Sequence, residues 1–279
     1  MKLLCSDKNK SMKPSIAIVG CGWLGLPLAK KLIQHGYPVS GSTTTPEKIA
    51  VLQESQIDPF LIQCNEQQVE GNWEAFLSGK EIVIIDIPPK LRGENRENFV
   101  AKIQTLISCI VTTTVTKVLF VSSTSVYSDT ETTVTESTIP QPDTESGKQL
   151  LEAENLLLSN PNFQTTIVRF GGLIGNDRNP VKFLAGKENI ENPEAPINFI
   201  HQTDCVGILL MIIEKEIWNE TFNAVAPSHP TREAYYTRKA LEFGLPQPQF
   251  SHEKPSSGKS ISSEKVQHIL GYEFQIPEL

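Results

Sequence analysis

The sequence Ser15-Ile-Ala-Ile-Val-Gly-Cys-Gly-Trp-Leu-Gly-Leu-Pro-Leu-Ala29 decides how the rest of the chain is interpreted. Four consecutive apolar residues precede Gly20, which predicts a short buried strand. Beyond the glycines, leucines recur every four residues and so predict the apolar face of a helix: Leu24, Leu28 and Leu32. The stretch therefore predicts a strand, a glycine turn and a helix in direct succession.

The three glycines of this turn have the spacing G-x-G-x-x-G, which between a strand and a helix is typical of a dinucleotide-binding site. Gly20 permits the tight turn, Gly22 lets backbone N–H groups approach a diphosphate, and Gly25 lets the helix pack on the strand. A glycine-rich turn can also merely join a strand to a helix, but the flanking apolar pattern favours an anion at the helix N-terminus. The predicted cofactor residues in this turn are Gly20, Gly22, Trp23, Leu24 and Gly25.

Composition limits the class of protein. The chain has 279 residues, enough for one large α/β domain or for a nucleotide domain with a small added lobe. A net charge of −7 without a basic run argues against nucleic acid as a partner. No apolar stretch approaches the roughly 20 residues that a membrane helix needs. We therefore predict no nucleic-acid partner and no membrane span, and a disordered tail over residues 1–13.

The cysteines are scattered along the sequence and form no C-x-x-C pair: Cys5, Cys21, Cys64, Cys109 and Cys205. An odd, dispersed set favours reduced thiols over disulfides or a zinc site. The sequence therefore predicts a cytoplasmic protein without a metal site.

Strand and helix patterns alternate after the first helix, as in repeated βαβ units. A second strand is expected within residues 35–45, and further strands are expected at 59–63, 81–87, 117–121, 165–170 and 221–225. Helices are expected at 99–111, 144–158, 205–214 and 231–243, with Asp204 as an N-terminal charge or cap of the third of these. The predicted fold class is α/β, a Rossmann-type doubly wound parallel sheet with a small C-terminal substrate lobe.

The predicted domain boundaries follow from where this alternation stops. Residues 14–175 are expected to form the NAD(P)-binding Rossmann domain, to which residues 197–225 return. Residues 176–196 and 226–279 are expected to form the small lobe, because the pattern there is irregular and contains several prolines.

The end of the second strand bears on the choice of cofactor. In this fold an acidic residue there binds the adenosine ribose 2′-hydroxyl, but Thr43 and Thr44 occupy the position. Lys48 is close enough in sequence to reach a 2′-phosphate, or it merely begins a solvated helix. NADP is therefore predicted in preference to NAD. Pro88 follows the fourth strand at the carboxyl edge of the sheet, where it is expected to line the cofactor path or to form a structural turn.

Several landmarks taken in order resemble the extended short-chain dehydrogenase/reductase family, the NAD-dependent epimerase/dehydratase group. They are the glycine turn, Ser122-Ser-Thr-Ser-Val-Tyr127, Arg169 with Gly175, Asn198-Phe-Ile-His-Gln-Thr-Asp204 and Leu270-Gly-Tyr272. The resemblance covers nearly the whole chain from about Pro14. It implies an oxidoreductase or epimerase/dehydratase that uses a nicotinamide cofactor on a small-molecule substrate, with helices 99–111 and 144–158 as the faces of a homodimer. Apolar residues on those helices could equally pack inside one subunit.

The sequence departs from the family at one catalytic position. Family members have a Tyr-x-x-x-Lys pair, whereas here Thr144 stands where the tyrosine is expected and Lys148 matches the lysine. A spacing of four puts both side chains on one helical face, so Lys148 is still expected at the nicotinamide ribose. A threonine hydroxyl is too weak an acid to replace the phenol. This pattern resembles the atypical branch of the family.

Other candidate catalytic residues lie at the tip of the fifth strand. Ser123 or Thr124 matches the family's substrate-side hydroxyl, or a Ser/Thr run simply satisfies backbone groups there. Tyr127 is a candidate replacement base, although in the family this position packs the loop. Two hypotheses therefore stand: an enzyme acting on an unidentified, nucleotide-linked substrate, and a non-catalytic NADP(H)-binding redox sensor or regulatory protein.

Overall fold

The computed structural model describes residues 13–89, 97–129 and 133–279. Except for Lys13, the predicted N-terminal tail lies outside the described residues. The core is a seven-stranded sheet in the order β12-β9-β7-β6-β1-β2-β3, and every strand pair in it is parallel. Its strands are β1 (Ile16–Val19), β2 (Val39–Thr43), β3 (Asp58–Leu61), β6 (Ile82–Ile85), β7 (Lys117–Ser123), β9 (Gln164–Phe170) and β12 (Thr221–Ala224).

The predicted doubly wound Rossmann sheet is thereby confirmed. From β1 the chain runs outward to β2 and β3, and then crosses back to β6 on the other side of β1. The strand order therefore reverses between β1 and β6, and such a switch point at the carboxyl ends of the strands is where doubly wound folds bind ligands.

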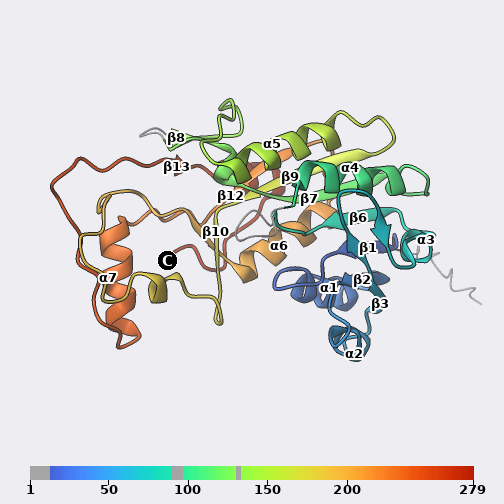
Figure 1. Ribbon diagram of the computed structural model, residues 1–279, viewed down its shortest axis with the longest axis horizontal. Coiled ribbons are helices and arrows are strands. Elements are labelled where there is room, and N and C mark those ends of the chain that lie inside the picture. The colour runs from blue at the N-terminus through green and yellow to red at the C-terminus, as the bar shows by residue number, and fades with distance from the viewer. Residues whose placement is uncertain (1–12, 90–96, 130–132) are drawn as a thin grey trace, which may run out of the picture.

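Two helical layers cover the sheet (Figure 1). One layer contains α1 (Gly25–Gln34), α6 (Gln202–Glu214) and α8 (Glu264–Leu270), and the other contains α3 (Trp73–Leu77), α4 (Phe99–Ile110) and α5 (Glu145–Leu158). Side chains alternate along β1, so Ile16 and Ile18 pack toward α1 while Ala17 and Val19 pack toward α4. This two-sided burial explains why β1 and β6 are continuous apolar runs in the sequence.

A third, smaller core lies at the far end of the long axis of the molecule, around α7 (Arg232–Glu242) (Figure 1). It joins segments distant in sequence through the buried side chains of Val181, Ile197, Tyr235, Tyr236 and Leu279. The two tyrosine rings meet edge to face, and Tyr235 does the same with Phe199.

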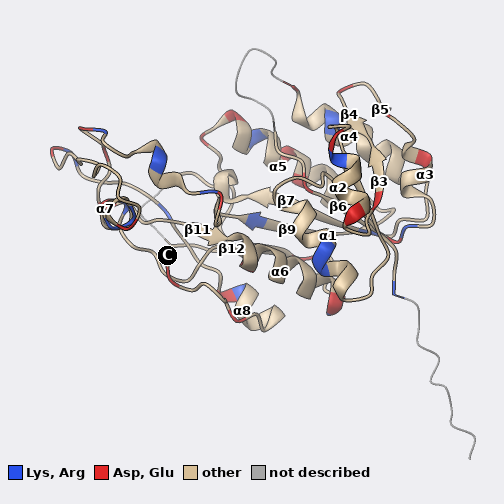
Figure 2. Cartoon of the chain, turned by 90° about the horizontal axis from the view of Figure 1, so that it is seen from below, with Lys and Arg blue, Asp and Glu red and all other residues tan. Residues whose placement is uncertain are grey.

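The remaining elements are short. They are α2 (Lys48–Glu54), the strands β4 (Gln63–Cys64), β5 (Val69–Glu70), β8 (Thr133–Val134), β10 (Gly172–Ile174), β11 (Phe199–His201) and β13 (Ser260–Ile261), and the 3₁₀ turns η1 (Thr124–Val126) and η2 (Pro180–Phe183). Basic and acidic positions are spread over the elements instead of gathering on one of them (Figure 2).

The start of α6 differs from the prediction in one detail. The N-cap is His201, whose side chain accepts a hydrogen bond from the Thr203 N–H, so of the two roles predicted for Asp204 the N-terminal charge is confirmed and the cap belongs to another residue. Asp204 does lie in the first turn, where a carboxylate suits the helix dipole. It is fully buried and accepts hydrogen bonds from the Tyr272 hydroxyl and from the Gln275 and Ile276 N–H groups. Asp204 thereby anchors the C-terminal segment to α6.

A buried polar network ties the second half of the sheet to α5. Glu154 is fully buried, and its carboxylate accepts hydrogen bonds from Arg169 Nη2 at 2.6 Å and from Ser122 Oγ at 2.5 Å. Arg169 Nη1 donates to the Tyr127 hydroxyl at 2.6 Å, and that hydroxyl donates to Asn223 Oδ1 at 3.1 Å. The network therefore links α5, β7, β9 and β12.

Replacing Arg169 by Met should lower the free energy of unfolding by about 3–5 kcal/mol, because Glu154 would lose its counter-charge inside the protein. Urea unfolding followed by circular dichroism measures this change. The matched control is Arg238→Ala, which removes the exposed Arg238–Glu242 ion pair and should change stability by no more than about 1 kcal/mol. If both substitutions lowered the free energy of unfolding equally, the buried Glu154–Arg169 pair would matter no more for stability than an exposed ion pair.

Candidate functional site

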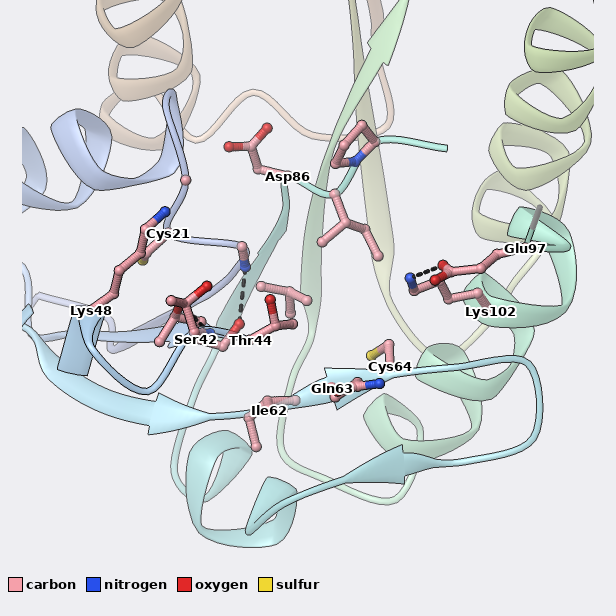
Figure 3. Close-up of a pocket in the computed structure, with 17 residues that line it drawn as sticks. Cys21, Ser42, Thr44, Lys48, Ile62, Gln63, Cys64, Asp86, Glu97 and Lys102 are labelled. Atoms are coloured by element: carbon pink, nitrogen blue, oxygen red, sulfur yellow. Dashed lines mark hydrogen bonds and ion pairs between the residues drawn. The ribbon is translucent and has the colours of Figure 1, made fainter. Parts of the chain in front are cut away.

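A cavity of about 360 Å³ lies at the carboxyl ends of β1, β2, β3 and β6 (Figure 3). Its walls are the glycine turn, the end of β2, the residues after β3, and the residues after β6, with α4 opposite Lys48. The cavity therefore occupies the switch point of the sheet, where the strand order predicts a ligand.

The glycine turn is held by backbone contacts on two sides. Gly20 has φ +102°, and a Cβ added there would stand 2.3 Å from the Asp86 carbonyl oxygen. Its N–H donates to Ser42 Oγ at 3.0 Å, and the Cys21 N–H donates to the Ser42 carbonyl at 2.7 Å. A Cβ on Gly25 would stand 2.2 Å from the Gly20 carbonyl oxygen. Only glycine fits at either position, because the turn is pressed between β2 and β6.

Gly22 differs from these two glycines. It lines the cavity, and a Cβ added to it would meet no atom within 4 Å. Within the described residues, the N–H groups of Trp23 and Leu24 form no hydrogen bond, so they remain free at the start of α1. This open space beside free N–H groups at a helix N-terminus fits a diphosphate.

The other predicted cofactor residues are divided between two places. Thr43, Thr44, Lys48 and Pro88 line the cavity together with Gly20 and Gly22. The side chain of Leu24 is buried in the core, and Gly25 packs behind Gly20.

Trp23 and Lys148 also stand outside the cavity lining. The Trp23 indole N–H donates to Asp177 at 2.8 Å, and its ring lies under the Arg178 guanidinium. Lys148 lies on α5 with an exposed side chain.

The end of β2 offers hydroxyl groups and a cation. Thr43 Oγ1 accepts a hydrogen bond from the Thr45 N–H at 3.1 Å, which shapes the bend that leads into α2. Thr44 and Lys48 are exposed where they border the cavity, and no residue from Ser42 to Thr45 is acidic. The two carboxylates in the cavity wall, Asp86 and Glu97, come from elsewhere in the chain.

Asp86, which the sequence reasoning passed over, lies next to the glycine turn. Burial raises the pKa of its carboxyl group to about 7, and a hydrogen bond from the Gly25 N–H opposes that rise. A signal was present in the sequence, because a carboxylate directly after Ile82-Val-Ile-Ile85 must lie at the carboxyl edge of the sheet.

Lys102 on α4 was also missed. It is 7% exposed and its Nζ lies 2.6 Å from Glu97 Oε2, on the side of the cavity opposite Lys48 (Figure 3). No sequence signal separates this lysine from a solvated one, because its neighbours on the helix are ordinary for an amphipathic pattern.

Burial makes the cysteine thiols of the cavity poor nucleophiles. All four cysteines in the described residues are free, as expected from their spacing: Cys21, Cys64, Cys109 and Cys205. Burial raises the pKa of Cys21 to about 12 and that of Cys64 to about 11. Both thiols that line the cavity therefore stay neutral, which disfavours a role as nucleophiles.

The predicted catalytic residues gather at a neighbouring point of the same sheet edge. A Cβ on Gly147 would stand 2.2 Å from the Ser125 carbonyl oxygen, so the start of α5 packs tightly on η1. This packing places η1, which follows Ser123 directly and begins at Thr124, against the first turns of α5, where Lys148 and the cap residue Thr144 lie. These four side chains are three hydroxyls and one amine, and none of them is a phenol.

Several of these hydroxyls already have structural partners. Ser123 Oγ accepts from the Ser125 N–H at 3.2 Å, and Thr144 Oγ1 caps α5 by accepting from the Gly147 N–H at 3.1 Å. Tyr127 is buried and its hydroxyl is shared between Arg169 and Asn223.

Comparison with known proteins places the chain in a family. Residues 20–198 match a family model described as NAD(P)H-binding. The chain belongs to this NAD(P)H-binding family. It is also 34% identical to protein YeeZ of Escherichia coli K12 over 266 residues, which cover 94% of this chain and 96% of that protein. The free N–H groups and the open space at Gly22 suit the nicotinamide cofactor that the family implies.

Solved structures confirm that this chain resembles the short-chain dehydrogenase/reductase and epimerase/dehydratase group in fold. A putative NAD-dependent epimerase/dehydratase from Methylobacillus flagellatus has a TM-score of 0.75 at 24% identity and covers 95% of this chain and 94% of its own. UDP-glucuronic acid 4-epimerase from Bacillus cereus, in complex with NAD, has a TM-score of 0.77 at 18% identity and covers 94% of this chain and 91% of its own.

Among the helices in residues 13–89, 97–129 and 133–279, none has the length and apolar character needed to cross a membrane.

Substituting Gly22 by Val should abolish detectable binding of a nicotinamide dinucleotide while changing stability by less than about 1 kcal/mol. The branched side chain would fill the open space beside the free N–H groups, where an added Cβ meets no protein atom within 4 Å. Isothermal titration calorimetry measures the binding, thermal melting checks the fold, and Gly22→Ala should give a smaller loss. Tight binding by a folded Gly22→Val protein would show that the diphosphate binds elsewhere.

Proposed function

We propose that the protein is an NADP(H)-dependent oxidoreductase or epimerase/dehydratase-like enzyme that acts on a small, nucleotide-linked substrate. The observation that carries this proposal is one cavity with the glycine turn at its wall and an uncharged, hydroxyl-rich strand end beside Lys48. The family match supports the nicotinamide cofactor, and the epimerases among its structural relatives suggest the reaction class.

Preference for NADP follows from charge at the end of β2. A carboxylate at this point would bind a ribose 2′-hydroxyl and repel a 2′-phosphate. The Thr43–Thr45 segment supplies hydroxyl donors instead, and Lys48 supplies a cation on the same wall of the cavity. These groups suit a phosphate monoester, because an ammonium group and hydroxyls can both donate to its oxygens.

The proposed chemistry takes place where β7 and α5 meet. A bound nicotinamide supplies hydride transfer to or from a carbon that bears oxygen. Ser123 or Thr124 would hold that oxygen by a hydrogen bond, and Lys148 would contact the nicotinamide ribose. Thr144 can hydrogen-bond but cannot serve as a base near neutral pH, so the proton would move through water or another group. A positioned general acid or base accelerates a reaction roughly 10²- to 10⁴-fold, and without one we expect slow turnover.

The second candidate is a non-catalytic NADP(H)-binding redox sensor. The hydroxyl of Thr144 is engaged as the helix cap, and that of Tyr127 is engaged by Arg169 and Asn223, which favours this alternative. A sensor must bind the reduced and oxidised cofactor with different affinities, because a ligand without differential affinity shifts no equilibrium.

Three further proposals concern organisation. Residues 14–175 with 197–225 would form the cofactor domain, and residues 176–196 and 226–279 would form a lobe over the substrate. The free thiols agree with a reducing compartment, and we propose the cytoplasm. A homodimer through the layer of α4 and α5 is the proposed assembly.

Lys48→Met should weaken NADP binding by about tenfold, the equivalent of one exposed charge-assisted hydrogen bond, and leave NAD binding unchanged. Calorimetric titration with each cofactor measures the two affinities. Lys187→Met is the control, because this exposed lysine lies outside the cavity lining. Tighter binding of NAD than of NADP by the unmodified protein would contradict the assignment.

Turnover separates the enzyme from the sensor. The unmodified protein should oxidise NADPH with at least one member of a panel of carbonyl compounds and sugar nucleotides, and Ser123→Ala should slow that reaction without weakening cofactor binding. Absorbance at the nicotinamide band follows the reaction. An inactive protein that binds NADPH and NADP⁺ with different affinities would support the sensor instead, and equal affinities would exclude it.

A further inference from the structure

Asp86 is the carboxylate of the cavity wall that stands beside the glycine turn. It follows β6 directly, and its N–H donates to the Val19 carbonyl at 2.9 Å, so its place beside β1 is fixed. Its Oδ2 atom lies 3.2 Å from the point where a Cβ on Gly25 would stand. Figure 3 shows this side chain at the upper part of the cavity, on the side of the turn.

With a cofactor bound as proposed, the Asp86 carboxyl and the diphosphate would both lie at the N-terminus of α1. The free N–H groups of Trp23 and Leu24 would face a diphosphate, and the Gly25 N–H hydrogen-bonds the Asp86 carboxylate. Two anions in one partly buried site repel each other, and the proton of one of them is then held more tightly. A neutral carboxylic acid, in contrast, has an O–H that can donate to a phosphate oxygen.

We infer that Asp86 binds the cofactor diphosphate as a neutral carboxylic acid, so that cofactor binding above neutral pH takes up one proton. This inference rests on the proposed cofactor site.

The electrostatic setting of Asp86 supports this role. Burial raises the pKa of Asp86 to about 7, so near neutral pH about half of the free protein already holds the proton. A bound diphosphate raises the pKa of this carboxyl further, because it adds negative charge nearby. The sign of the effect follows: affinity is constant below pH 7 and falls as the pH rises above it.

The thiols that face Asp86 from the neighbouring elements do not titrate in this range. Cys21 faces it from the glycine turn, and Cys205 faces it from α6, with Asp204 beside that thiol. Burial raises the pKa of both thiols, so they remain neutral. Arg178 acts on Cys205 from the loop after β10, and Lys48 lines the same cavity as Asp86.

A purely structural role would behave differently. As a hydrogen-bond partner of the Gly25 N–H alone, Asp86 would contribute only to the stability of the folded protein. Its replacement would then alter stability, but cofactor binding would involve no proton.

The test is calorimetric titration of the full chain with NADH, which has no phosphate monoester that titrates near neutrality. The dissociation constant of the unmodified protein should rise about tenfold between pH 6 and pH 8, as a group with a pKa of about 7 requires. Asp86→Asn, which resembles the neutral acid in shape, should bind at both pH values about as tightly as the unmodified protein does at pH 6. Cys205→Ala should keep the tenfold rise.

A proton count on the unmodified protein keeps the test independent of whether the variant folds. Titrations at pH 8 in two buffers of different ionisation enthalpy should report uptake of about one proton per NADH bound, against almost none at pH 6. Cofactor binding without proton uptake at pH 8, or an unchanged pH dependence in Asp86→Asn, would overturn the inference alone. Failure of NADH and NADPH to bind at any pH would instead overturn the proposed function.

Discussion

The structure of the site depends on a backbone contact between the glycine turn and the end of β6. Val19 pairs with Ile85 in the sheet, so Gly20 and Asp86 leave their strands at the same level. A Cβ on Gly20 would meet the Asp86 carbonyl oxygen, and only a residue without one allows the turn to close there. This contact places the N-terminus of α1 at the switch point and sets Asp86 beside it. The proposed diphosphate position, the cavity wall and the acidic neighbour are thus consequences of one close approach.

A buried polar network fixes the neighbouring part of the sheet, where β7 and β9 pack against α5. The Glu154–Arg169 pair and its hydrogen bonds to Ser122 and Tyr127 connect α5 to three strands in the interior. Because a buried pair tolerates little displacement of either partner, α5 has a fixed position over β7. The same packing brings the cap residue Thr144 close to the strand tip. Tyr127 serves in this network, so its phenol belongs to the support of the site and is absent from its proposed chemistry.

Much of the fold could be predicted because its strands are buried on both faces. Four apolar residues in β1 and four in β6 give a continuous signal, and α1, α4 and α5 are long enough to show helical periodicity. The helix α3 and the hairpin of β4 and β5 were not predicted, since elements of five and two residues are too short for periodicity. Of the two roles predicted for Asp204, the charge in the first turn of α6 is confirmed, whereas the cap is His201 and the Asp204 carboxylate accepts hydrogen bonds from the C-terminal segment.

The site was predictable where backbone geometry decides it and less so where tertiary packing does. The glycine spacing and the uncharged end of β2 are local features, and both border the cavity. Lys102 reaches the cavity only because α4 packs beside the residues that follow β3, which no local pattern reveals. Burial of Asp86 likewise depends on tertiary packing, because the end of β6 meets the end of β1 and the start of α1 there.

A crystal structure of the protein with NADP⁺ bound tests the central claim most directly. We expect electron density for the diphosphate within hydrogen-bonding distance of the Trp23 and Leu24 N–H groups, with the adenosine end toward Thr44 and Lys48. Density for the nucleotide elsewhere, or a glycine turn closed over its own N–H groups in the complex, would contradict it.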